Sequence, residues 1–384
     1  MAERKNNITD YVKETTETFQ NLPFNPVDSL VLSQLSYAKL ERVKDGLREL
    51  EPGIRDFFRG EFFRQVFDDD ISDDQNLDLF AYAAGSPRFR GLPVKHIEAV
   101  MDPDSETQFA AMTFELDGDT DYVAFRGTDG NLFGWKEDFN MSFLKEVPAQ
   151  TMAVDYLNRH YRSENPSGGR RRLIIGGHSK GGNLAIYGGL RCDASIHPRI
   201  RQIFSHDGPG FQTDVLQTLT DIQARDGIHI MRLVPESSVI GMLLASGSDY
   251  ETVDCEGMGI MQHYAFSWNV DLDAHDFIYT EGLSSAGEYN GRMIREWLSS
   301  ASLEERQDFT DTLYALLTDN GIHTLTDLKN LTPRRIAALA ASLGNVDDEK
   351  RKTFFRVLRS LAAASLHQLG PDQDQDQDQK ELPL

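Results

Sequence analysis

The sequence predicts an α/β fold in which helices cover both faces of a mostly parallel central sheet. Two observations carry this prediction. Apolar strands alternate with helical segments between residues 149 and 234, and such alternation is typical of parallel βαβ units. In addition, a buried strand, a glycine-rich turn and a small-residue helix follow one another in LIIGGHSKGGNLAIYGG at 173–189. That order places a serine at the carboxyl end of a sheet strand.

The elements can be assigned in chain order. Apolar residues at helical spacing over 27–49, after Asn25-Pro26, favour a helix. Three β-rich runs between 93 and 127, separated by DPDSET and DGDTD, predict an antiparallel meander that leads into the sheet. The alternating region then adds helices and strands at 149–161, 173–175, 201–205, 212–224 and 228–234.

Composition divides the chain into four segments. A polar N-terminal segment covers 1–24, the α/β domain covers 25–283, and a helical C-terminal region with Ser, Thr and Asp caps covers 284–368. We expect this helical region to pack on the sheet domain or on a partner. The acidic, repetitive tail over 369–384 lacks apolar mass and is expected to be disordered.

Charge and cysteine content exclude several classes of protein. Lys and Arg number 39 against 61 Asp and Glu, so the formal net charge of −22 disfavours binding to nucleic acid or to an anionic membrane. The sequence has no apolar run long enough for a membrane span, and its N-terminus lacks a signal-peptide core. Cys192 and Cys255 form neither a disulfide framework nor a metal-ligand pattern. We therefore expect a cytoplasmic protein that needs no metal and no cofactor.

Ser179 is the candidate nucleophile. It is the serine of a G-x-S-x-G turn, flanked two positions away by Gly177 and Gly181. A Cβ at either glycine would collide with the adjoining strand or helix, and the sharp turn holds the serine in a strained conformation. The N-terminus of the following helix directs N–H groups at a developing oxyanion. The alternative is a tightly packed strand-to-helix turn without chemistry.

The second requirement of such a site is an oxyanion hole. One donor is expected from the N–H of Lys180, which follows the serine, and the other from a loop after an early strand. The segment DYVAFRGTD at 121–129 fits that loop, because Gly127 permits close approach and Thr128 offers both an N–H and a hydroxyl. The alternative is that residues 127–130 form only a turn.

Three further side chains belong to this region. Trp135 and Asp138 are expected to brace the oxyanion loop. The Lys180 side chain stands at the mouth of the predicted pocket, where it would either favour an anionic substrate or simply be solvated.

Two resemblances rest on these residues. VAFRGTD followed by Trp135 and Asp138 resembles the oxyanion segment of class 3 lipases. Four segments together resemble the Mbeg1-like family of bacterial proteins over roughly residues 25 to 270, and VPESSVIGMLL and MQHYAFSW extend the match. The resemblance implies an α/β-hydrolase fold and a serine hydrolase, without indicating a substrate. The four segments are NPVDSLVLSQLSY, FRGTDG with the following W and DF, GGHSKGGNLAIY and SHDGPGF.

The base is sought among the histidines that follow Ser179, because α/β-hydrolases place serine, acid and histidine in that order. His263 lies in a loop after YETVDC, the last plausible strand, and matches the QH segment of the family. We therefore prefer His263, with His275 in reserve; His206 was the third loop candidate.

The sequence offers more than one candidate for the acid that orients the histidine. In class 3 lipases it follows the strand that resembles 228–234, but here Ser238 occupies that place. Asp207, in SHDGPGF, is preferred, and Glu236 is the alternative acid. A third arrangement is a Ser-His dyad in which Ser238 orients the histidine as a neutral group.

These residues predict a serine hydrolase that acts on an ester or thioester through an acyl-enzyme on Ser179. One rival is a binding or scaffold protein that keeps the fold without effective catalysis, and the departure at Ser238 motivates it. A second rival is an acyltransferase with the same serine turn. The acyl-chain length and the oligomeric state stay open.

Overall fold

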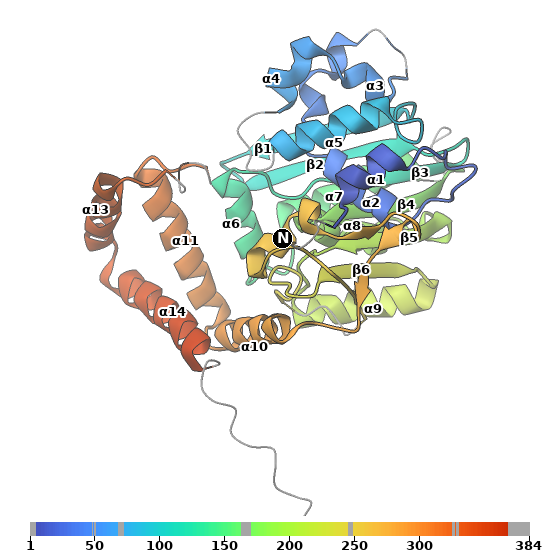
Figure 1. Ribbon diagram of the computed structural model, residues 1–384. Coiled ribbons are helices and arrows are strands. Elements are labelled where there is room, and N and C mark those ends of the chain that lie inside the picture. The colour runs from blue at the N-terminus through green and yellow to red at the C-terminus, as the bar shows by residue number, and fades with distance from the viewer. Residues whose placement is uncertain are drawn as a thin grey trace, which may run out of the picture.

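The computed structural model describes residues 5–47, 49, 51–67, 73–162, 170–244, 249–324, 327 and 330–367. Within these residues, an eight-stranded sheet with the order β1-β2-β3-β4-β5-β6-β7-β10 forms the centre of the molecule (Figure 1). A small two-stranded sheet pairs β8 with β9. The strand bounds are β1 Val94–Asp102, β2 Thr107–Glu115, β3 Thr120–Phe125, β4 Arg172–His178, β5 Ile200–His206, β6 Ile230–Pro235, β7 Glu251–Val253, β8 Val270–Asp271, β9 Asp276–Phe277 and β10 Tyr279–Thr280.

The pairing of the strands confirms the predicted fold class. Strands β1, β2 and β3 form the antiparallel meander, β3 to β7 are parallel, and β10 returns antiparallel on β7. Strand β10 follows the residues that the sequence analysis took for the last strand. In the parallel part, His178 at the end of β4 pairs with His206 at the end of β5. The residues after these two strands therefore leave the same edge of the sheet side by side.

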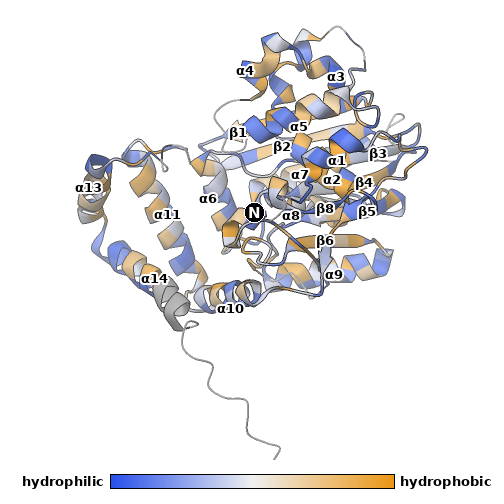
Figure 2. Ribbon diagram, in the orientation of Figure 1, coloured by the Kyte–Doolittle hydropathy of each residue, from blue (hydrophilic) through white to orange (hydrophobic). Residues whose placement is uncertain are grey.

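Helices cover both faces of the sheet. Successive residues of a strand point to opposite faces, and β3 shows this directly: Tyr122 joins the core beneath α1, α2 and α5, whereas Val123 joins the core beneath α7 and α8. Figure 2 shows hydrophobic residues along β6 and mixed hydrophobic and hydrophilic residues on α9, which covers one face. The helices of the sheet domain are α1 Ile8–Glu14, α2 Pro26–Leu35, α3 Ile54–Phe57, α4 Phe63–Val66, α5 Asp73–Gly85, α6 Leu132–Asn140, α7 Pro148–Tyr161, α8 Lys180–Arg191 and α9 Thr213–Asp226.

The N-terminal part differs from the sequence-based expectation in two ways. Ile8 and Tyr11 of α1 are fully buried in the core of the sheet domain, so this domain begins before the boundary placed at residue 25. The helix expected over 27–49 ends at Leu35, and the hydroxyl of the C-cap residue Ser36 donates to the carbonyl of Ser33, 2.6 Å away. Short 3₁₀ helices occur at Leu40–Arg42, Lys44–Gly46, Gly60–Phe62, His197–Arg199, Gly259–His263, Ala265–Ser267 and Leu343–Asn345.

The C-terminal helices form a separate layer beside the sheet domain (Figure 1). They are α10 Ser285–Ser299, α11 Leu303–Asp319, α13 Pro333–Ser342 and α14 Asp348–His367. Phe309, Phe354 and Val357 share a small core between α11 and α14, and α11 packs against α6 of the sheet domain. The tail expected to be disordered, 369–384, lies outside the described residues. Among the described helices, none is both long and apolar enough to cross a membrane.

The turn between β4 and α8 requires glycine at two positions, because a side chain there would collide with the backbone. A Cβ on Gly177 would lie 2.2 Å from the carbonyl carbon of Gly181, and one on Gly181 would lie 2.1 Å from the carbonyl oxygen of Phe125. These backbone atoms cannot move away without distorting β3 or α8. The two glycines therefore let strand β4, helix α8 and strand β3 meet at one point.

Adding a methyl group at this point is expected to destabilise the fold. Gly181→Ala should lower the free energy of unfolding by about 1–3 kcal/mol, the usual cost of overpacking, as measured by urea denaturation followed by circular dichroism. Gly85→Ala is the matched control, since nothing lies within 4 Å of its added Cβ. A loss of stability at Gly85 as large as that at Gly181 would contradict this account.

Candidate active site

Ser179 stands at the carboxyl end of β4 in a strained backbone conformation. Its φ of 58° and ψ of −131° lie where L-residues are rare. The Ser179 N–H donates to the carbonyl of His206, 2.9 Å away on the neighbouring strand, and α8 begins at the next residue. The conformation is thus held by the sheet on one side and by the helix on the other, as a nucleophile elbow requires.

The loop after β3 lies against this serine. A Cβ on Gly127 would be 3.2 Å from the Cβ of Ser179 and 2.6 Å from the carbonyl of His178. The Thr128 N–H has no acceptor among the described residues, and the Lys180 N–H belongs to the first turn of α8, which lacks intrahelical acceptors. Two backbone N–H groups without acceptors among the described residues therefore lie beside the serine, on the residues from which the sequence analysis expected an oxyanion hole.

Asp207 and His263 form a hydrogen-bonded pair at the same edge of the sheet. His263 Nδ1 lies 2.6 Å from Asp207 Oδ2. The other carboxylate oxygen accepts the Ser238 hydroxyl at 2.6 Å and the Gly241 N–H at 3.0 Å. Asp207 is fully buried. A carboxylate that accepts three hydrogen bonds in this setting is fixed in place and directs the other nitrogen of His263, Nε2, away from itself.

The remaining sequence candidates lie elsewhere. Glu236 accepts a hydrogen bond from Gln262 at 3.5 Å rather than from the histidine. His206 is fully buried and bonds to Ser29 at 2.8 Å. The ring of His275 lies edge-on to Tyr11, with centroids 6.3 Å apart. Of the candidate acids and bases, the structure brings only Asp207 and His263 together.

His178 also belongs to this cluster, although the sequence analysis did not assign it a role. Its Nε2 donates to the carbonyl of His263 at 2.7 Å, and the two rings stand 4.7 Å apart. Burial, together with the neighbouring His263, lowers the pKa of His178 to about 3. His178 is therefore neutral at physiological pH, and its single N–H positions the backbone that carries His263. Its place inside the serine motif was the only available signal.

The Lys180 side chain is not at the mouth of a pocket. Its ammonium is fully buried and donates to Glu137 Oε2 and to the carbonyl of Gln108, both 2.9 Å away. The sequence alternatives of a solvated lysine or an anion-binding lysine are both wrong for this side chain. Instead, it ties the start of α8 to α6 and β2.

Asp138 contacts the loop after β3, which the sequence analysis expected it to brace. It accepts the Thr128 hydroxyl at 2.6 Å and lies 3.8 Å from the Lys180 ammonium. Burial raises the pKa of Asp138 to about 6, against the lowering effects of Lys180 and the Thr128 hydroxyl. Trp135 lies on the preceding turn of α6, and its Nε1 is buried without a hydrogen-bond partner among the described residues.

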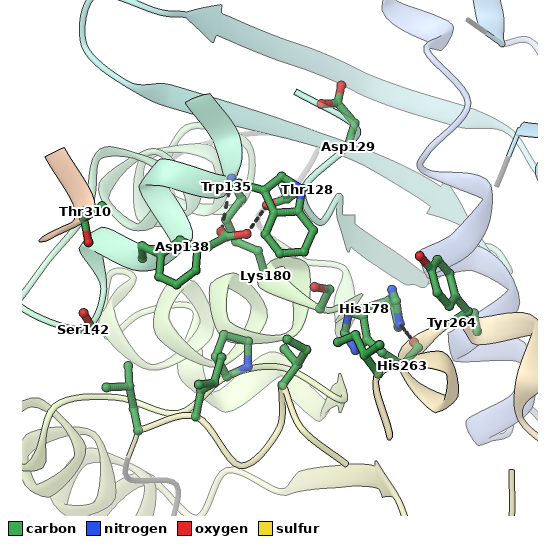
Figure 3. Close-up of a pocket in the computed structure, with 18 of the residues that line it drawn as sticks. Thr128, Asp129, Trp135, Asp138, Ser142, His178, Lys180, His263, Tyr264 and Thr310 are labelled. Carbon is green, nitrogen blue, oxygen red and sulfur yellow. Dashed lines mark hydrogen bonds and ion pairs between the residues drawn. The ribbon is translucent and has the colours of Figure 1, made fainter. Parts of the chain in front are cut away.

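An apolar cavity of about 200 Å³ joins these groups. Ser179, His263, Thr128 and Asp138 all line it, and no hydrogen bond connects the side chains of Ser179 and His263, both of which the structure describes. Figure 3 shows His178 and His263 at one end, with Ser142 and Thr310 beyond Asp138 at the other. The C-terminal helices supply part of the wall: Trp297, Leu298, Arg306, Phe309, Thr310 and Val357.

A model of the Mbeg1-like family matches residues 83–315. The chain belongs to the Mbeg1-like family. This confirms the resemblance noted from the sequence. No curated protein sequence matches the chain. Within the part of this Mbeg1-like protein that the structure describes, no group of three or more His, Cys, Asp or Glu side chains is placed to hold a metal ion.

Solved lipase structures are similar to this Mbeg1-like chain at a distance. Lipase II from Rhizopus niveus is 12% identical with a TM-score of 0.37, and the match covers 58% of this chain and 77% of that one. The Rhizomucor miehei lipase propeptide complex is 12% identical with a TM-score of 0.34, and the match covers 62% of this chain and 78% of that one. The M37 lipase is 15% identical with a TM-score of 0.34, and the match covers 56% of this chain and 68% of that one.

The raised pKa of Asp138 predicts a pH-dependent stability. The folded protein binds this proton more tightly than the unfolded chain, where the ordinary pKa is 3.8. Stability is therefore gained as the pH falls from 8 to 5 and lost as it rises through 6. Asp138→Asn removes this titration, so wild type should gain about 1 kcal/mol over the variant between pH 8 and pH 5. Urea denaturation at four pH values measures the difference.

Asp102→Asn is the control for this measurement. The pKa of the half-buried Asp102 lies below its ordinary value because the Ser105 hydroxyl and two backbone N–H groups donate to it. Its titration therefore falls below the measured range, and the difference between variant and wild type should not change between pH 5 and 8. A flat difference for Asp138→Asn as well would contradict the burial of an ionised Asp138.

Proposed function

We propose that this protein is a serine hydrolase that cleaves a carboxylic ester or thioester through an acyl-enzyme on Ser179. One observation carries the proposal. The strained serine, two backbone donors and a histidine bonded to a buried aspartate all border one apolar cavity. Such a convergence of nucleophile, base, orienting acid and oxyanion donors defines acyl-transfer sites irrespective of fold.

The chemistry follows from the roles of the groups. Ser179 Oγ attacks the carbonyl carbon while His263 Nε2 accepts the hydroxyl proton, and Asp207 stabilises the imidazolium that results. The N–H groups of Thr128 and Lys180 stabilise the oxyanion of the tetrahedral intermediate. The imidazolium then protonates the leaving alcohol or thiol. In the second half of the reaction, water attacks the acyl-enzyme while His263 accepts its proton, and His263 then returns the proton to Ser179 Oγ as the acid product leaves.

The lining of the cavity and the state of the cysteines support this proposal. The surface of the cavity is mainly apolar, which suits the acyl or alcohol part of a small ester. Both cysteines are buried and free, in keeping with the cytoplasmic location proposed from the sequence. No metal or cofactor enters the proposed mechanism.

The nucleophile can be tested directly. A fluorophosphonate probe should label the wild-type protein, and Ser179→Ala should abolish both labelling and ester turnover, because the proposed mechanism forms the covalent adduct on Ser179 Oγ. Gel fluorescence and mass spectrometry of the labelled peptide provide the measurement. Ser195→Ala, at an exposed serine, is the control and should label like wild type. Equal labelling of the Ser179→Ala protein would refute the proposal.

The acid can be tested by comparing two carboxylates. Asp207→Asn should reduce kcat by about 10⁴, since an amide cannot stabilise the imidazolium and favours the wrong tautomer. Glu236→Gln should change kcat by less than about tenfold, because Glu236 does not contact His263. Steady-state kinetics with a 4-nitrophenyl ester measure both. The reverse order of effects would assign the acid to Glu236.

A further inference from the structure

One cation at the far end of the cavity has no counter-ion in the described part of the chain. The guanidinium of Arg306, on α11, donates to the carbonyl oxygens of Ser142, at 2.8 Å, and of Leu298. Its Nε is buried without a hydrogen-bond partner, and no carboxylate among the described residues pairs with it. Arginine has five N–H donors, so two backbone acceptors leave much of its capacity unused.

This lack of a partner is unusual in so acidic a chain. Acidic residues outnumber basic ones by 61 to 39, yet three of the carboxylates close to Arg306 along α11 are paired with other cations. Asp308 pairs with Lys350, Asp311 with Lys136 and Glu305 with Arg356. The other lysine or arginine that lines the cavity, Lys180, is paired with Glu137. Arg306 is therefore the cationic group of the cavity wall that can receive an anion.

Burial of this cation is unfavourable without compensation. Desolvation lowers the pKa of the Arg306 guanidinium, but an arginine side chain stays protonated in proteins. Partial burial of a charge costs free energy unless an opposite charge or strong acceptors face it. An anionic ligand group would supply both a charge and acceptors that match the planar guanidinium.

The charges along the cavity orient such a ligand. Asp138 lines the cavity beside the loop after β3, and Ser142 and Thr310 lie beyond it, at the end away from His263 (Figure 3). Arg306 belongs to that end, because it donates to the carbonyl of Ser142 at 2.8 Å. Apolar side chains, including Phe309, Trp297 and Leu243, line the cavity as well. A carboxylate or phosphate would thus be repelled near the serine and attracted to the opposite end.

We propose that the substrate is an ester or thioester with an apolar body that carries an anionic group, a carboxylate or a phosphate, which Arg306 binds while the scissile carbonyl lies at Ser179. This inference rests on the proposed hydrolase activity. Arg306 thereby determines substrate specificity, because it binds the end of the substrate remote from the reacting atoms.

The test compares esters that differ in one charge. The 4-nitrophenyl monoester of suberic acid has a free terminal carboxylate, and its methyl-capped analogue has none; 4-nitrophenyl 8-phosphonooctanoate is the phosphate-like arm. Wild type should show a kcat/KM about 10- to 100-fold higher for an anionic ester than for the capped one, the usual range for a charge-assisted pair. The better of the two anionic arms identifies the group. A ratio of one or less overturns the proposal.

Variants assign the preference to a residue. Arg306→Met should reduce the ratio of the two kcat/KM values towards one, and Arg306→Lys, which keeps the charge, should retain part of it. Arg356→Met, whose guanidinium pairs with Glu305 outside the cavity, should keep the wild-type ratio. A wild-type ratio in a folded Arg306→Met protein would show that Arg306 is only a structural clamp.

A binding experiment separates this inference from the hydrolase proposal. Calorimetry on the Ser179→Ala protein should show tighter binding of monomethyl suberate than of dimethyl suberate, and added Arg306→Met should remove the difference. Turnover without charge preference would overturn the anion site and leave the hydrolase intact. Arg306-dependent binding in a protein that hydrolyses neither ester would overturn the hydrolase and leave the anion site.

Discussion

The register between β4 and β5 is the constraint on which the site depends. Because His178 pairs with His206, the residues that follow, Ser179 and Asp207, leave the sheet at the same level on adjacent strands. Both have positive φ values, 58° and 50°, so both chains turn sharply at this edge. Ligand sites of parallel sheets lie at the carboxyl ends of strands for this reason. A shift of β5 by one residue would point Asp207 to the other face and leave His263 without its partner.

A buried charge organises the other half of the site. Glu137 of α6 is fully buried, and besides the Lys180 ammonium it accepts the backbone N–H groups of Gln108 and Ala149, at 3.1 and 2.9 Å. One carboxylate thereby joins β2, the start of α7 and the start of α8. This pair occupies the Lys180 ammonium, which leaves the backbone N–H of Lys180 as its proposed contribution to the oxyanion hole. Loss of either partner would leave an uncompensated charge in the core.

These two arrangements show why the sequence predicted some parts of the site and not others. The serine turn was predictable because its constraint is local: Gly177 and Gly181 must lack side chains, and the flanking strand and helix are adjacent in sequence. For the acid the sequence favoured Asp207 but kept Glu236 as the alternative, because both follow strands of the sheet and only the pairing of those strands decides which one faces His263. Lys180 was misjudged for a similar reason, since its partner Glu137 lies 43 residues away. The mostly parallel sheet followed from alternating strand and helix patterns, whereas α1 in the core and the edge strand β10 depend on distant contacts.

The division of labour within the molecule has a consequence for substrate choice. The groups proposed for chemistry all come from the edge of the sheet, where strand register and buried charges hold them. Much of the remaining cavity wall comes from α10, α11 and α14, which share a small core of their own and meet the sheet domain where α11 packs on α6. Side chains on these helices, such as Phe309 and Arg306, can therefore change without disturbing the register of β4 and β5. The chemistry proposed for Ser179 and the selectivity proposed for Arg306 thus rest on separate structural elements, and variants that affect one should leave the other measurable.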